Sequence, residues 1–168
     1  MISKIALASY AATVLSFAIA MPNDATAQGT TTEARAQRGA EVVRSLNNGK
    51  VQPTLEAMRL EFPFLAEATE AYALGDVWSR PGLDQRTRQL AAVAAMAALG
   101  ETGTMRVHAA YALNIGVTEN ELKEVIYMIT VPAGFPRAIA ASQVLSELFQ
   151  ERRAAADKPS ASHTPSSK

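Results

Sequence analysis

Apolar residues recur at intervals of three and four along most of the chain, which is the spacing of one face of an α-helix. The pattern is clearest between Asp84 and Gly100 and in the segment that follows, up to Gly116. Asp84 is a favourable N-cap residue, and glycine commonly follows the last turn of a helix. One face of the second segment holds Met105, His108, Ala112 and Ile115. The pattern therefore predicts two helices joined by a tight turn, with His108 on an apolar face.

The same spacing predicts five further helices. They are residues 33–48 with Thr32 as a cap, a short helix capped by Thr54 that ends before Phe62, one opened by Pro63, one that begins at Glu119, and one opened by Pro136. Thr118 and Glu121 match a capping box, in which each side chain satisfies a backbone N–H of the other. Pro132 is expected to stop that helix near Val131. Because no segment alternates as a strand does, we expect an all-α fold.

The first 27 residues have the three-part pattern of a secretory signal peptide. Lys4 precedes an alanine-rich apolar run over residues 5–20, and Ala25-Thr26-Ala27 offers a small-residue cleavage site. The apolar run is shorter than a membrane span requires. We therefore expect cleavage after Ala27, a periplasmic or secreted protein, and no membrane span after cleavage.

One domain over residues 28–153 accounts for most of the rest of the chain. Residues 154–168 are rich in Ser and Pro, include His163, lack apolar periodicity and are expected to be a disordered tail. Lys plus Arg and Asp plus Glu both number 16, so no basic field exists to hold nucleic acid. The chain has no cysteine, which excludes thiol chemistry. With one histidine in the folded region and no phosphate-binding glycine loop, we expect neither a metal nor a cofactor.

His108 is the sharpest candidate for chemistry, either as a general acid or base or as a partly buried structural histidine. Arg86 and Arg88 lie in the first turn of their helix, where the helix dipole disfavours cations. Either they form ion pairs, with Asp84 or with another helix, or they build a carboxylate site to which Arg80 contributes. Gln89 could donate a hydrogen bond in the same cavity. Tyr72, Tyr111 and Tyr127 could donate there too, but aromatic residues at helical spacing are more often part of the core.

Several short motifs occur in a fixed order over roughly residues 38–149. They are residues 72–84 (YALGDVWSRPGLD), Arg86-Thr87-Arg88, Ala98-Leu99-Gly100, His108, Ala112-Leu113-Asn114, Gly116-Val117-Thr118 and Ala133-Gly134-Phe135-Pro136. Taken together they resemble the carboxymuconolactone decarboxylase family. The resemblance implies an alkylhydroperoxidase D-like helical bundle whose subunits assemble into homotrimers or homohexamers.

The resemblance also separates two kinds of chemistry. A peroxidase branch uses two cysteines and a glutamate, and the matching positions here are Glu101, Thr104 and Gln89, so a thiol peroxidase is excluded. The other branch removes CO₂ from a carboxylated lactone without a cofactor. By resemblance, His108 is the acid that protonates carbon, and Arg80, Arg86 and Arg88, with Gln89, bind a small carboxylated substrate.

Two hypotheses follow. The first is an exported carboxy-lyase, of the 4-carboxymuconolactone decarboxylase type or performing a related lyase or isomerase step. The second is a non-catalytic oligomeric binder or scaffold of the same fold. The retention of His108 beside the arginines favours the enzyme. Gln89, and Pro132 where relatives often carry a tyrosine, favour the binder.

Overall fold

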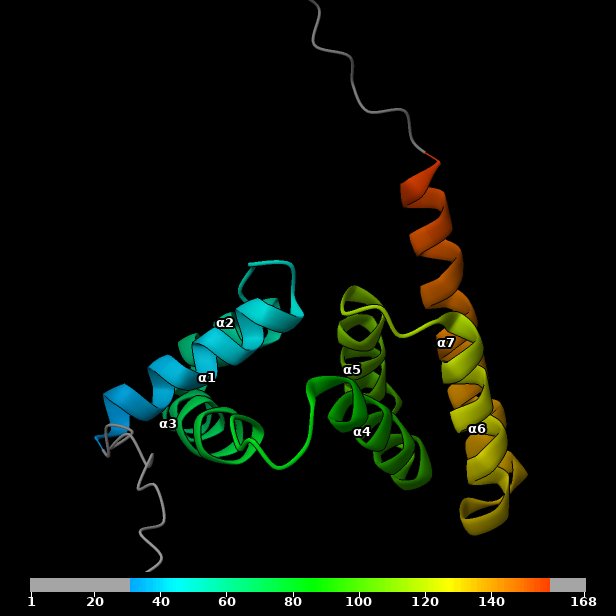
Figure 1. The fold of residues 1–168 in the computed structure, drawn as a ribbon, viewed down its shortest axis with the longest axis horizontal. Helices are drawn as coiled ribbons and strands as arrows, with labels where there is room; N and C mark the ends of the chain where they lie inside the picture. The colour runs from blue at the N-terminus through cyan, green and yellow to red at the C-terminus, as the bar shows by residue number, and fades with distance from the viewer. Residues whose placement is uncertain (1–30, 158–168) are drawn as a thin grey trace, which may run out of the picture.

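The computed structural model describes residues 31–157, and in that part of the chain all regular structure is helical, which confirms the all-α fold (Figure 1). The elements are α1 (Thr32–Leu46), α2 (Pro53–Glu61), α3 (Pro63–Ala68), the π-helix η1 (Thr69–Trp78), α4 (Gln85–Leu99), α5 (Thr102–Asn114), α6 (Glu119–Ala133) and α7 (Phe135–Ala156). The expected signal peptide and its cleavage site lie outside the described residues. Among the residues that are described, no helix is long and apolar enough to cross a membrane.

Local sequence signals place most helix ends. The Asp84 carboxylate accepts a hydrogen bond from the Thr87 backbone N–H at 2.9 Å, and Gly100 takes the left-handed conformation, with φ of 83°. Thr118 and Glu121 form the complete capping box. Two expected caps are wrong by one or two residues. Thr31 caps α1, and α2 begins at Pro53 with Gln52 as its N-cap, because proline at the first position needs no N–H partner.

Two helices run further than expected. α6 continues through Pro132 to Ala133, and the Gly134 N–H still bonds to the Thr130 carbonyl at 3.1 Å. A proline so close to the helix end disturbs only the final turn, so the expected stop near Val131 is wrong. α7 continues to Ala156, three residues into the segment 154–168 that is expected to be a disordered tail. The rest of that tail, from residue 158 on, lies outside the described residues.

α1 packs closely along η1, and two glycines allow this contact. A Cβ atom on Gly39 would lie 2.1 Å from the Glu70 carbonyl oxygen, and one on Gly75 would lie 2.0 Å from the Arg35 carbonyl oxygen. Beside them the Asp76 carboxylate forms ion pairs with Arg35 and Arg38. The two helix backbones therefore touch where the sequence has no side chain.

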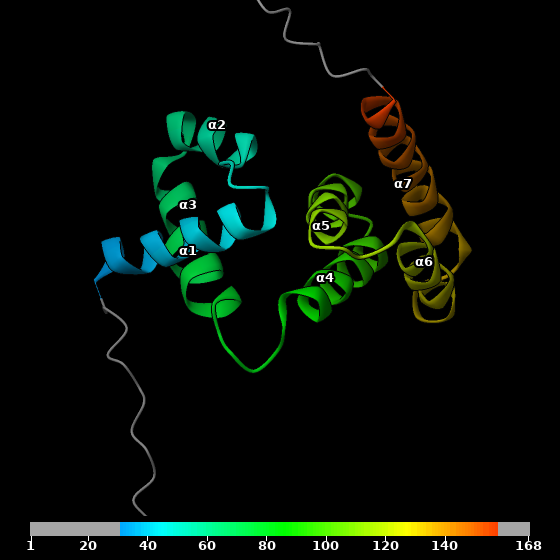
Figure 2. The same ribbon diagram turned by 45° about the horizontal axis from the view of Figure 1, so that its top comes forward.

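The helices form two layers. α1 to η1 make the N-terminal layer and α4 to α7 the C-terminal layer, with α4 and α5 facing the N-terminal layer and α6 and α7 on the far side (Figures 1 and 2). The main core lies within the C-terminal layer, around Val93, Met105, Leu122, Ile129 and Leu145. A second cluster of Val42, Leu46 and Tyr111 joins α1 to α5. The boundary between the layers is where the candidate site lies.

Candidate active site

His108 lies on α5 between two aromatic residues. Its ring stacks on that of Trp78, the last residue of η1, with centroids 5.2 Å apart and an interplanar angle of 11°. The Tyr111 ring meets it edge-on at 6.2 Å. Met105 and Ala112, which share its predicted face, are fully buried in the main core. His108 is therefore held at the boundary between the two layers, because Trp78 belongs to the N-terminal layer and Tyr111 to α5 of the C-terminal layer.

Gln89 fixes the orientation of the histidine ring. It comes from α4 and is fully buried, and its Oε1 lies 2.9 Å from His108 Nδ1. A carbonyl oxygen only accepts, so Nδ1 carries the proton and Nε2 is left free to exchange one. The Nε2 of Gln89 has no hydrogen-bond partner among the described residues. The structure thus joins Gln89 to His108, but as a residue that positions the ring rather than one that lines the cavity.

Burial lowers the pKa of His108 below its ordinary value of 6.5. The charged imidazolium loses more hydration free energy on burial than the neutral ring does, so the neutral form is favoured in the folded protein. At neutral pH the imidazole is uncharged in the absence of a ligand.

This lowered pKa predicts how stability depends on pH. As pH falls through 6.5, the unfolded chain binds a proton at His108 that the folded chain does not. The contribution of neutral His108 to the free energy of unfolding is fully present above pH 6.5. It is lost as pH falls towards the pKa that His108 has in the folded protein, at up to about 1.4 kcal/mol per pH unit. Between pH 7 and pH 5, the free energy of unfolding measured in urea should therefore fall more for the natural protein than for His108→Gln. An equal fall in the two proteins would contradict a partly buried His108 that is neutral in the folded state.

A cavity of about 490 Å³ opens beside His108. Its wall is mostly apolar and combines both layers: Val43, Gln52, Thr54, Leu55, Thr69, Leu74, Gly103, Thr104, Val107, His108 and Tyr111. The Tyr111 hydroxyl accepts a hydrogen bond from Gln52 Nε2 at 2.9 Å. Burial raises the pKa of Tyr111, so its hydroxyl stays protonated and can donate to an oxygen in the cavity.

The three arginines lie away from this cavity. Arg86 forms an ion pair with Glu121 of α6, and this contact and the Thr118 backbone N–H lower the pKa of Glu121 to about 2. The Arg88 guanidinium donates to the backbone carbonyls of Leu83, Val77 and Arg80. Arg80 borders a separate cavity of about 440 Å³ near Asp84. The structure therefore shows the ion-pair alternative for Arg86. It does not bring the arginines together with His108, and their role as carboxylate holders stays a prediction.

Sequence reasoning did not assign three neighbours of the histidine to the site. Trp78 comes from a different layer, so only the packing of η1 against α5 reveals it. Gln52 lies 59 residues from Tyr111, with which it bonds. Tyr111 itself lies three residues after His108, at the helical spacing of one face, and that spacing could have identified it. Within residues 31–157 no group of three His, Cys, Asp or Glu side chains could hold a metal ion.

Comparison with known proteins defines the family. The model of the carboxymuconolactone decarboxylase family matches residues 63–147. The chain is 35% identical to 4-carboxymuconolactone decarboxylase of Acinetobacter baylyi over 127 residues, which cover 75% of this chain and 95% of that protein. It is 32% identical to nitrosuccinic acid decarboxylase of Metarhizium robertsii over 98 residues, 56% of this chain and 68% of that one. An uncharacterized protein of Paracoccus denitrificans is 26% identical over 117 residues, 68% of this chain and 87% of its own.

The chain belongs to the carboxymuconolactone decarboxylase family. Its fold is the all-α, alkylhydroperoxidase D-like bundle. Two relatives named as decarboxylases support a decarboxylase-like function.

Proposed function

We propose that this protein is an exported carboxy-lyase that removes CO₂ from a small carboxylated, lactone-like molecule without a cofactor. The observation on which the proposal chiefly rests is the His108 arrangement: a partly buried imidazole whose Nδ1 is hydrogen-bonded to Gln89, beside a largely apolar cavity. A largely apolar wall solvates a bound carboxylate poorly, which favours its loss as neutral CO₂.

The proton in this reaction comes through His108. A bound carboxylate next to the neutral imidazole favours the imidazolium, because an opposite charge raises a histidine pKa. When the carbon–carboxylate bond breaks, CO₂ leaves and its electron pair delocalises towards the lactone carbonyl. Nε2 of His108 then gives its proton to the carbon, and the imidazole becomes neutral again. One proton from solvent is consumed for each CO₂ released.

Two other side chains assist in this scheme. Gln89 accepts from Nδ1 in both charge states of the ring, so it holds the ring in one orientation and leaves Nε2 for proton transfer. The protonated Tyr111 hydroxyl can donate to the lactone carbonyl oxygen as negative charge develops on it.

One observation favours the rival function, a binder without catalysis. Among the residues that line the His108 cavity there is no Lys or Arg, so nothing in that wall opposes the charge of a carboxylate. A neutral ligand would fit such a wall without further help.

CO₂ release separates the two functions. Purified protein that begins at Gln28 is incubated with γ-carboxymuconolactone, with nitrosuccinic acid and with related carboxylated lactones. An enzyme of the proposed class releases CO₂ from at least one of them at a rate above the spontaneous one. If a folded preparation releases none from any member of the panel, the carboxy-lyase proposal fails and the binding role stands.

Export and assembly are parts of the same proposal. Export rests on the signal-peptide pattern, and recovery of uncleaved protein in the cytoplasmic fraction of cells would contradict it. Assembly into homotrimers or homohexamers is supported by exposed large apolar side chains on α2, α3, α6 and α7, among them Leu60, Phe64, Val131 and Phe135. A monomeric mass in sedimentation would contradict it.

A further inference from the structure

A second cavity adjoins the His108 cavity. It has a volume of about 370 Å³ and is lined by Asn47, Lys50, Val51, Gln52, Pro53, Arg106, Val107, Ala110, Tyr111 and Leu148. Gln52, Val107 and Tyr111 line both cavities. Val107 and Tyr111 lie one helical turn apart on α5 and form the border, with His108 on one side of it and Arg106 on the other. The hydrogen bond from Gln52 to Tyr111 lies at this border.

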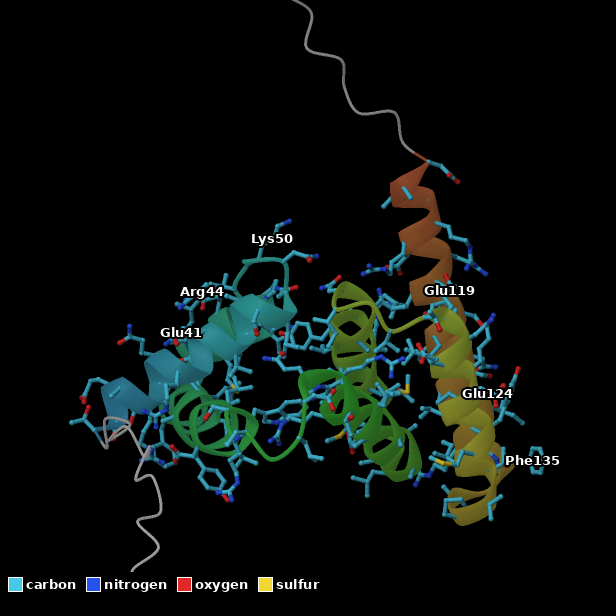
Figure 3. All side chains as sticks on the ribbon, viewed as in Figure 1. Glu41, Arg44, Lys50, Glu119, Glu124 and Phe135 are labelled. Carbon is cyan, nitrogen blue, oxygen red and sulfur yellow. The ribbon has the colours of Figure 1, made fainter. Side chains whose placement is uncertain are left out.

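The second cavity differs from the first in charge. Its lining includes two cations, Lys50 and Arg106, and no Asp or Glu. Lys50 is exposed on the loop between α1 and α2, at the edge of the N-terminal layer (Figure 3). Arg106 pairs through Nη2 with Glu151 of α7, while its Nη1 is buried and has no partner among the described residues. The residues that line this cavity therefore carry positive charge, and Glu151, which pairs with Arg106, is not among them.

We propose that the two cavities are one elongated substrate site, in which Lys50 and Arg106 bind a carboxylate and the His108 cavity binds an apolar or lactone ring. The proposal deepens the proposed function and rests on it. The carboxylate bound by Lys50 and Arg106 is one that the reaction retains, whereas the carboxylate that leaves as CO₂ lies beside His108. Lys50 comes from the loop between α1 and α2 and Arg106 from α5, so an ammonium and a guanidinium line this cavity from different layers. A carboxylate can accept hydrogen bonds from both. The ligand class is a small ring compound with a carboxylate side arm.

The sole tryptophan gives a direct measure of binding, because Trp78 stacks on His108 and its fluorescence responds to a ligand there. The probes are muconolactone, an unsaturated lactone with one carboxymethyl group, and its methyl ester, which has the same ring without the charge. The natural protein is expected to bind the acid about tenfold more tightly than the ester. Lys50→Gln and Arg106→Gln should each weaken binding of the acid and leave binding of the ester unchanged. The double variant should bind both equally.

Glu151→Gln is the matched control. It breaks the same α5–α7 ion pair as Arg106→Gln but keeps the cation, so it should bind the acid at least as tightly as the natural protein does. Equal loss in both variants would show that Arg106 matters only for packing of α7. If Arg106→Gln does not fold, Lys50→Gln still tests the site, because Lys50 is exposed on a loop.

The proposal is overturned if the natural protein binds acid and ester equally or binds neither, or if Lys50→Gln leaves their affinity ratio unchanged. These outcomes are distinct from failure of the carboxy-lyase function, which is measured by CO₂ release. A protein that releases CO₂ but shows no preference for the acid holds its substrate's carboxylate elsewhere.

Discussion

Replacing His108 with glutamine is expected to lower CO₂ release by about 10²–10⁴-fold, the usual contribution of a positioned general acid. Glutamine cannot deliver a proton to carbon, whereas the imidazolium of His108 can. Its side-chain amide can still donate to Gln89 Oε1, so the buried acceptor on α4 keeps a partner. The measurement is initial CO₂ release from whichever substrate the natural protein accepts, together with a thermal melt.

The melt distinguishes a catalytic histidine from a structural one. If His108 is catalytic, the His108→Gln variant should melt at nearly the same temperature as the natural protein at pH 7, while its CO₂ release falls by the large factor given above. A variant that melts much earlier but still turns over would contradict the assigned role. His163→Gln is the matched control, since it makes the same exchange at the chain's other histidine and should leave both quantities unchanged.

Replacing Gly75 with alanine is expected to destabilise the protein by about 3 kcal/mol or more. The added Cβ would lie 2.0 Å from the Arg35 carbonyl oxygen and 3.0 Å from the Glu70 carbonyl oxygen, and both are backbone atoms that cannot rotate away. α1 would have to move off η1. Because η1 positions Trp78 against His108, the stacked pair should separate as well. Urea unfolding, followed by circular dichroism, measures the loss.

Gly103→Ala is the control for that change. Gly103 lies in the first turn of α5, and a Cβ there would meet no atom within 4 Å. Alanine is the better helix former, so this variant should be as stable as the natural protein or more stable by up to about 1 kcal/mol. If Gly75→Ala were equally well tolerated, the close contact of α1 with η1 would not exist in solution.

The parts of the fold that follow from the sequence are those that depend on neighbouring residues. The capping box at Thr118 and the left-handed Gly100 involve contacts within a few positions, so local patterns predict them. The π-helix does not follow from apolar spacing, because a stretch of i→i+5 bonds shifts the face by only a fraction of a turn. The close contact of α1 with Gly75 joins residues 40 positions apart in the chain, so no local pattern contains it either.

In the candidate site, too, some features follow from local sequence patterns and others depend on packing between distant segments. His108 is identifiable from its place on an apolar face, and its contact with Gln89 depends on how α4 packs against α5, 19 residues away. For the first-turn arginines the sequence leaves an ion pair and a ligand site open, because an ion-pair partner far along the chain is not visible in a local pattern. In the structure Arg86 meets Glu121, 35 residues later, and Arg88 turns back to its own loop.

His108 lies in the C-terminal layer, whereas much of the wall of its cavity belongs to the N-terminal layer. His108 and Gln89 fall within residues 63–147, the segment that the family model matches, whereas Val43, Lys50, Gln52 and Leu55 precede it. Mutations in α1, α2 and their connecting loop therefore change the wall of the site and leave His108 untouched. Swapping residues 43–55 between family members would be a direct way to alter substrate choice while the proposed acid, His108, stays constant.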